Sequence, residues 1–143
     1  MINYVRRYWI KIIALDIYGT ILATEDPENL LKPRKGLEKF FDKCKAKGIK
    51  VVASSDADTT NIKIDLKESG ANVAKFDRFY ELKQAPKDFS VIIKDYGINP
   101  KELLVVGDSD KDIEGAINCK AGHFRVPEYK NLEDNFDLSG IEL

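Results

Sequence analysis

The chain has 143 residues, which is enough for one domain with a single hydrophobic core. Its 23 basic and 24 acidic side chains give a net charge of −1, so no overall electrostatic field favours nucleic acid or an anionic membrane as a partner. The cysteines Cys44 and Cys119 and the single histidine, His123, are too few soft ligands for a zinc site. Near the start of the chain Lys11 interrupts the apolar residues, which predicts neither a signal peptide nor a membrane span and favours a cytoplasmic protein.

Short apolar runs alternate with segments of helical periodicity along the chain. The pattern predicts strands over residues 11–16, 50–54, 73–79, 103–106 and 123–126. Between them it predicts helices that begin near residue 37, at 58 or 59, at 86 and near 113, the first three ending at Gly48, Gly70 and Gly97. This order is typical of an α/β fold with a doubly wound, mostly parallel Rossmann-like sheet flanked by helices, formed by one domain over residues 1–143. The acidic tail after Pro127 is expected either to wrap an edge of the sheet or to fray.

Polar side chains follow three of the predicted strands at the point where each strand ends. Asp16 ends the first strand, Ser55 follows the second, and Asp108 follows the strand over 103–106. Taken singly, each is explained as the cap of a turn or helix. Because the carboxyl ends of parallel strands face one crevice, we expect the three to meet there. Two carboxylates from different strands repel each other unless a cation lies between them, and oxygen ligands favour magnesium.

The same segments resemble, in order, the four sequence motifs of the haloacid dehalogenase superfamily. Residues 16–20, Asp-Ile-Tyr-Gly-Thr, resemble the first motif, which is D-x-D-G-T in the phosphatases and D-x-Y-G-T in the haloacid dehalogenases. Residues 51–55 resemble the second motif, an apolar strand that ends in Ser or Thr. Residues 83–86, followed by Phe89, resemble the third, in which K-P-x-P opens a helix, and residues 107–112 resemble the fourth, G-D-S-x-x-D.

The resemblance implies a phosphohydrolase that works through a covalent intermediate. Asp16 would be the nucleophile, forming an aspartyl-phosphate that water later hydrolyses. Magnesium would be held by Asp16, the backbone carbonyl of Tyr18, Asp108 and Asp112, and would screen the repulsion between a carboxylate and a phosphate dianion. In this interpretation Asp112 orients either the lysine of the third motif or a water on the metal.

The resemblance also implies a set of phosphate-binding residues. Ser55 would donate a hydrogen bond to a phosphoryl oxygen, and Thr20, with the backbone around residues 18–19, would position the phosphate. Lys83 would neutralise negative charge at the site and hold the Asp16 side chain in place. The motif register favours Lys83, which lies just before Pro86, although surface lysines are mostly solvated and Lys87 is a competing candidate.

Tyr18 departs from the phosphatase motif. Phosphatases of the family have a second Asp here, which protonates the leaving group and then activates water; such general acid–base help contributes about 10²–10⁴ in rate. A tyrosine, with a pKa of about 10, donates a proton but is a poor base near neutral pH. We therefore expect a slow phosphatase, or one that acts on good leaving groups such as acyl phosphates. Asp56 follows Ser55 where family members often have Asn, and it would either substitute as the base or cap a helix.

Two other functions stay open. A 2-haloacid dehalogenase fits Tyr18, because a halide leaves without a proton, but the acidic pair Asp108 and Asp112 opposes it. The segments between residues 16 and 55 and between 55 and 83 are also filled by predicted elements, which leaves no room for the helical cap that those dehalogenases use. The third interpretation is a domain that binds a phosphorylated ligand or partner without turning it over.

The expected absence of a cap leaves the site open to solvent. Either a second copy of the chain in a homo-oligomer or a large substrate would then cover it, so the expected partner is a small phosphorylated molecule or a phosphorylated macromolecule. Neither nucleic acid nor a membrane is expected. The loop over residues 22–31, with Glu25, Asp26 and Glu28, is interpreted equally well as a small flap or as an ordinary acidic surface loop.

Overall fold

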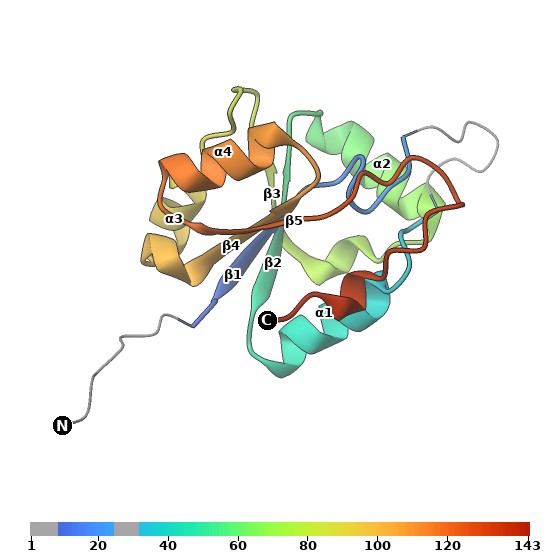
Figure 1. Ribbon diagram of the computed structural model, residues 1–143, viewed down its shortest axis with the longest axis horizontal. Coiled ribbons are helices and arrows are strands. Elements are labelled where there is room, and N and C mark those ends of the chain that lie inside the picture. Colours follow the sequence, from blue (N-terminus) through green and yellow to red (C-terminus); the bar gives the residue numbers. More distant parts are fainter. Residues whose placement is uncertain (1–8, 25–31) are drawn as a thin grey trace.

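Nine helices and strands alternate along the described part of the chain (Figure 1). The structure, a computed structural model, describes residues 9–24 and 32–143, so most of the lead-in before the first strand and the acidic residues of the predicted flap lie outside it. The elements are β1 (Ile12–Leu15), α1 (Leu37–Ala46), β2 (Lys50–Ser55), α2 (Thr59–Ser69), β3 (Phe76–Glu81), α3 (Ser90–Tyr96), β4 (Leu103–Gly107), α4 (Asp110–Asn118) and β5 (Gly122–Arg125). Three short 3₁₀ turns complete them: η1 (Val73–Lys75), η2 (Pro100–Glu102) and η3 (Leu138–Gly140).

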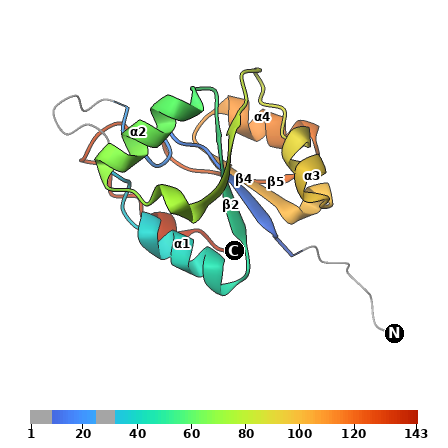
Figure 2. The ribbon, with the colours of Figure 1, turned by 180° about the vertical axis from the view of Figure 1, so that it is seen from behind.

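The five strands form one parallel sheet in the order β3-β2-β1-β4-β5, which confirms the predicted fold class. Helices α1 and α2 cover one face of the sheet, and α3 and α4 cover the other (Figures 1 and 2). From β1 the chain proceeds outward to β2 and β3, and then crosses to β4 and β5 on the other side. The order therefore reverses between β1 and β4, and in open α/β sheets ligands bind at the carboxyl end of such a reversal.

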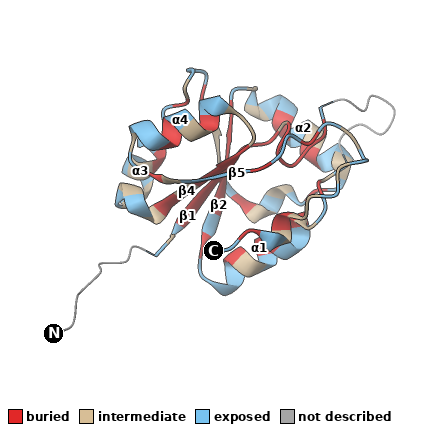
Figure 3. Cartoon of the chain, viewed as in Figure 1, coloured by how far each residue is buried: buried red, intermediate tan, exposed pale blue. Residues whose placement is uncertain are grey.

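The hydrophobic core lies on both faces of the central strands (Figure 3). All four residues of β1 are buried, as expected of a parallel strand that is covered on both sides. On one face they meet Phe40 of α1 and Leu66 of α2, and on the other Ile92 of α3 and Ala116 of α4. Among the residues that the structure describes, no helix has the length and apolar content needed to cross a membrane.

The starts of β3 and α3 differ from the predicted ones, each for a local reason. The third strand begins at Phe76 because residues 73–75 form a 3₁₀ turn, in which the Asn72 side chain accepts a hydrogen bond from the N–H of Ala74. Helix α3 begins at Ser90 instead of residue 86. The N–H of Lys87 donates to the carbonyl of Lys111 at 3.0 Å, so this stretch is held by α4 as a loop.

The C-terminal tail packs against helix α1, so it neither wraps an edge of the sheet nor frays, and both predicted alternatives are wrong. Leu138 and Ile141 are fully buried. The ammonium group of Lys43 on α1 donates to the carbonyls of Ser139 and Ile141 at 2.7 and 2.9 Å. The tail is therefore a packed part of the fold, and it lies over α1 (Figure 1).

Candidate active site

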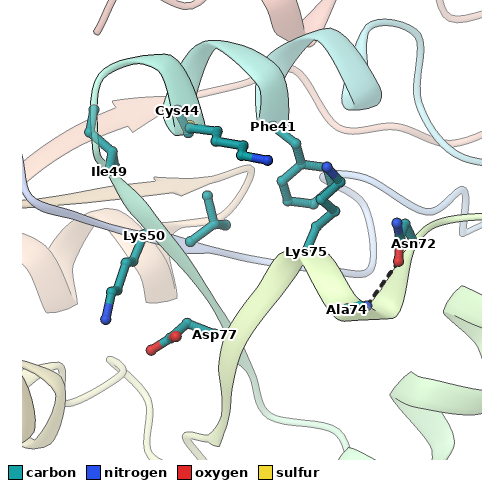
Figure 4. A pocket seen from close by; sticks show the side chains of 10 residues that line it. Phe41, Cys44, Ile49, Lys50, Asn72, Ala74, Lys75 and Asp77 are labelled. Carbon is teal, nitrogen blue, oxygen red and sulfur yellow. Dashed lines mark hydrogen bonds between the residues drawn. The ribbon is translucent and has the colours of Figure 1, made fainter.

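A small polar cleft of about 190 Å³ lies where the strand order reverses, at the carboxyl ends of β1 and β4. Its lining residues are Asp16, Tyr18, Ser55, Asp56, Lys87, Asp108, Ser109 and Lys111. A larger hollow of about 440 Å³ lies at the opposite end of the sheet, between α1 and the starts of β2 and β3 (Figure 4). That hollow has one carboxylate, Asp77, so the residues suited to chemistry gather in the smaller cleft.

Three carboxylates come together at the cleft. Asp16, Asp108 and Asp112 each offer one oxygen, and these three oxygens lie within 4.8 Å of one another. Asp16 directly follows β1, and its N–H donates to the carbonyl of Val106 on β4 at 2.9 Å, so the parallel ladder fixes its place. Burial raises the pKa of the Asp16 carboxyl to about 6, against the lowering by the charge of Lys87, and the nearby Asp108 raises it further.

Lys87, and not the predicted Lys83, is the lysine of this cluster. The Lys87 ammonium group lies 3.0 Å from Asp16 Oδ1, 2.6 Å from Asp112 Oδ1 and 3.0 Å from the carbonyl of Ser54, and the residue is only 4 % exposed. Lys83 is exposed and pairs with Asp58 at 2.9 Å. The reason is that residues 83–86 lie on the exposed loop after β3, whereas the backbone of Lys87 is hydrogen-bonded to Lys111 of α4.

A glycine on α4 makes the position of Lys87 possible. A Cβ atom added to Gly115 would lie 2.2 Å from the carbonyl oxygen of Lys87 and 2.9 Å from the Phe89 ring. Any side chain there would push the loop outward, because the first of these contacts is with backbone. The close approach of α4 to this loop therefore depends on Gly115.

Asp112 supports the lysine from the first turn of α4. Its carboxylate is completely buried; Oδ1 accepts from Lys87, and Oδ2 accepts from the hydroxyl of Ser109 at 3.1 Å. Burial raises the pKa of Asp112, and the Asp16 charge raises it further. Asp112 is completely buried and does not line the cleft, unlike Asp16 and Asp108, which assigns it to holding Lys87 and not to direct contact with a metal.

Thr20 connects the first and fourth motifs. Its buried hydroxyl lies 3.0 Å from Asp16 Oδ2 and 3.1 Å from Asp108 Oδ1. A hydroxyl has one proton and donates to one of these carboxylates at a time. Thr20 therefore fixes the spacing of the two carboxylates, and its predicted contact with phosphate remains a prediction.

Tyr18 lines the cleft, but its hydroxyl group is bound to α2. It donates a hydrogen bond of 2.5 Å to Asp65 Oδ2, a partner that lies 47 positions away and that the sequence did not indicate. Burial raises the pKa of the Tyr18 phenol, and the hydrogen bond to Asp65 raises it further. The phenol therefore keeps its proton and donates it in a hydrogen bond to Asp65, not to a group in the cleft.

Ser55 lies at the end of β2 and is buried at the wall of the cleft. Its Oγ accepts a hydrogen bond from the N–H of Ala57 at 3.2 Å, which shapes the turn into α2. Asp56 is exposed at the rim, where it lies 3.4 Å from the ammonium group of Lys111. Ser55 is thus placed where the sequence predicts it, and Asp56 is not within the buried cluster.

The charge of the cluster suits a divalent cation. Three carboxylates face one ammonium group, so ionised carboxylates leave an excess of negative charge in a largely buried place. Such charge is stable only when paired or metal-bound. Asp16, Asp108 and the backbone around Tyr18 provide oxygen ligands of the kind that magnesium prefers. The residues present therefore fit the metal that the sequence predicts.

The profile of the haloacid dehalogenase-like hydrolases matches residues 26–120. Among curated proteins, the chain is 30% identical over 96 residues to the chloroplastic protein SUPPRESSOR OF QUENCHING 1 of Arabidopsis thaliana. That match covers 59% of this chain and 9% of the plant protein, so the chain spans about a tenth of its relative.

Solved structures share the fold at low identity. A haloacid dehalogenase family enzyme from Bacteroides thetaiotaomicron, in complex with magnesium and inorganic phosphate, is 15% identical with a TM-score of 0.68, over 86% of this chain and 97% of that one. A family hydrolase from Deinococcus radiodurans, with bound phosphate and sodium, is 10% identical with a TM-score of 0.69, over 82% of this chain and 80% of that one. These likenesses show the fold.

Proposed function

The chain belongs to the haloacid dehalogenase-like hydrolases, and we propose that it is a magnesium-dependent phosphohydrolase in which Asp16 is the nucleophile. The observation that carries this proposal is the arrangement around the Asp16 carboxylate. One of its oxygens accepts from Lys87, the other lies 3.0 Å from the Thr20 hydroxyl, and Asp108 lies beside it in the cleft. A carboxylate held in this way is oriented before a substrate arrives, which is how positioning lowers a reaction barrier.

The reaction divides into two displacements. An Asp16 carboxylate oxygen attacks phosphorus, the bond from phosphorus to the leaving group breaks, and an aspartyl-phosphate forms; water then attacks phosphorus and releases Asp16. Lys87 opposes the effect of burial on the Asp16 pKa and so keeps the nucleophile ionised near neutral pH. Magnesium held by Asp16, Asp108 and the Tyr18 carbonyl would supply compensation for the negative charges of nucleophile and phosphate. Ser55 and Lys87 line the cleft, and we assign them to the phosphoryl oxygens.

The leaving group determines which substrates suit the site. Because the Tyr18 proton is held by Asp65 and the phenol pKa is raised, no acid stands at this position to protonate an alkoxide. Substrates whose leaving group is already a weak base, such as acyl phosphates, need no such acid. We therefore propose that acyl phosphates are hydrolysed faster than alkyl phosphates.

The test compares acetyl phosphate with glycerol phosphate, each with magnesium or with a chelator. We expect magnesium-dependent release of phosphate that Asp16→Asn abolishes. Tyr18→Asp is expected to raise turnover of the alkyl ester by about tenfold or more, since it restores general acid–base help. Asp65→Asn is the matched control, because it alters the partner of Tyr18 without adding an acid. Activity that persists in Asp16→Asn would refute the nucleophile, and no gain in Tyr18→Asp would refute the missing-acid argument.

Tyr18 itself favours a second candidate, a dehalogenase in which Asp16 displaces halide from carbon. The crowding of Asp16 by two other carboxylates argues against it, because a metal bound there would occupy the nucleophile. Release of halide from a 2-haloacid in the presence of a chelator would support this candidate. A burst of covalent phosphate on Asp16 without further release would instead support a binding role without turnover.

The cleft opens to solvent, since its rim residues Asp56 and Lys111 are exposed. We propose that the substrate is a phosphorylated small molecule or a phosphorylated segment of a macromolecule, and that either a second copy of the chain or a large substrate covers the opening. Light scattering at the assay concentration tests the second statement. A monomer that hydrolyses small phosphates efficiently would contradict it.

A further inference from the structure

We infer that the C-terminal segment over residues 129–136 positions the site loop, residues 16–22, and that Arg34 and Asp134 are positioning residues for the reaction. This inference rests on the proposed function of the site loop. Its basis is a continuous series of contacts that runs from the C-terminal segment to the nucleophile. None of these contacts was indicated by the sequence motifs, because the partners lie far apart along the chain.

The first contact is a buried ion pair. Arg34 is 1 % exposed, and its Nε and one terminal nitrogen donate to the two oxygens of Asp134 at 3.1 and 2.7 Å. The guanidinium group also lies over the rings of Phe136 and Tyr129, at 4.8 and 5.4 Å from their centroids. A buried guanidinium needs its counter-charge, since an unpaired charge in the interior is strongly unfavourable. Asp134 therefore fixes where Arg34 lies.

The second set of contacts holds the outer side of the site loop. The other terminal nitrogen of Arg34 donates to the carbonyl of Thr20 at 3.3 Å, and the Arg34 N–H donates to the carbonyl of Ile21 at 2.8 Å. The N–H of Tyr129 donates to the carbonyl of Gly19 at 2.7 Å. Three consecutive carbonyls of the loop are thus held by Arg34 and by the C-terminal segment.

The inner side of the same loop touches the carboxylates. The Thr20 hydroxyl lies within hydrogen-bond distance of Asp16 and Asp108. Gly19 has a φ of +83°, and a Cβ atom added to it would lie 2.6 Å from Asp108 Oδ2. The loop is therefore fixed between the carboxylates and the C-terminal segment, and a shift of Thr20 alters the spacing of Asp16 and Asp108.

The expected consequence concerns the metal. Residues that orient metal ligands through hydrogen bonds typically change metal affinity by about 10–100-fold when they are replaced. Asp134→Asn keeps the shape of the side chain but removes the counter-charge of Arg34. We expect it to weaken magnesium binding by up to about tenfold, the lower end of that range, because Asp134 acts on the ligands only through Arg34 and Thr20.

The test is isothermal titration calorimetry with magnesium chloride at a temperature where circular dichroism shows each variant folded. Lys43→Met is the matched control, because Lys43 anchors the tail to α1 through Ser139 and Ile141 without touching the site loop. Magnesium affinity should fall in Asp134→Asn and stay at the wild-type value in Lys43→Met. Hydrogen–deuterium exchange of the metal-free protein should rise over residues 16–22 in Asp134→Asn alone.

The outcomes separate this inference from the proposed function. A wild-type protein that binds no magnesium refutes the proposed metal site, while the exchange measurement still decides whether the loop is held by Asp134. Wild-type affinity in a folded Asp134→Asn, or equal weakening in Lys43→Met, overturns the inference. If Asp134→Asn does not fold, Phe136→Leu removes one ring from Arg34 and leaves the ion pair; it should weaken magnesium binding in the same direction, and an unchanged affinity overturns the inference.

Discussion

Replacing Lys87 by methionine is expected to destabilise the protein strongly at neutral pH. The ammonium group has three acceptors within 3.0 Å, two of which are the carboxylates of Asp16 and Asp112. Removing one partner of a buried ion pair costs about 3–5 kcal/mol of unfolding free energy, because the remaining charge is left uncompensated. The carboxylates relieve part of this cost by taking up protons, so we expect a loss near the lower end of that range.

The pH dependence of the loss follows from the same charges. Burial already raises the pKa of Asp16 to about 6 and raises that of Asp112 above its usual value, and without Lys87 both values rise further. The folded variant then binds more protons than the unfolded chain, so its unfolding free energy decreases as the pH rises. The difference between Lys87→Met and the wild type should therefore grow from pH 5 to pH 8.

Urea unfolding followed by far-ultraviolet circular dichroism, with a chelator present, measures this loss. Tryptophan fluorescence is a poor probe here, because the single tryptophan, Trp9, is 77% exposed in the folded protein. Lys83→Met is the matched control: it removes an exposed ion pair with Asp58 and should leave both stability and hydrolysis unchanged. Wild-type stability in Lys87→Met, or a comparable loss in Lys83→Met, would refute the assignment of Lys87 to the site.

Two further predictions follow from the packing and the protonation of the site. Gly115→Ala should lower the unfolding free energy by about 1–3 kcal/mol, because the new methyl group meets the Lys87 carbonyl. Gly140→Ala is the control, because the space around its added Cβ atom is open. Equal urea midpoints for the two variants would contradict the close approach of α4 to Lys87. Magnesium binding should weaken as the pH falls below about 6, because protons compete with the metal for Asp16 in the metal-free protein. Calorimetry at pH 5, 6, 7 and 8 checks this, and an affinity that stays constant down to pH 5 would speak against the raised pKa.

The places of Asp16, Ser55 and Asp108 were predictable because they depend on local patterns. A short apolar run in the sequence indicates a buried parallel strand, and the residue that follows this strand lies at the carboxyl edge of the sheet. The alternation of such runs with helical segments also predicts the parallel sheet that the structure has. Each of these features depends on residues that are neighbours along the chain.

The identity of the buried lysine was decided by tertiary structure. Lys83 and Lys87 lie on one loop, and both are long, flexible and charged, so sequence register alone favoured the wrong one. The close packing of α4 at Gly115 against the backbone of Lys87 brings this residue to the carboxyl end of the sheet, where its side chain reaches Asp16 and Asp112. The choice between two near neighbours was thus made by a contact with a distant helix.

The sequence by itself determined the order of the elements and the residues at the ends of the strands, since hydrophobic periodicity and chain direction are local properties. The tertiary structure alone decided that Tyr18 donates to Asp65, 47 positions away, and that Arg34 pairs with Asp134, 100 positions away. Such pairs depend on how the helices and the tail pack, and a polar side chain gives no periodic signal of which distant partner the packing brings to it.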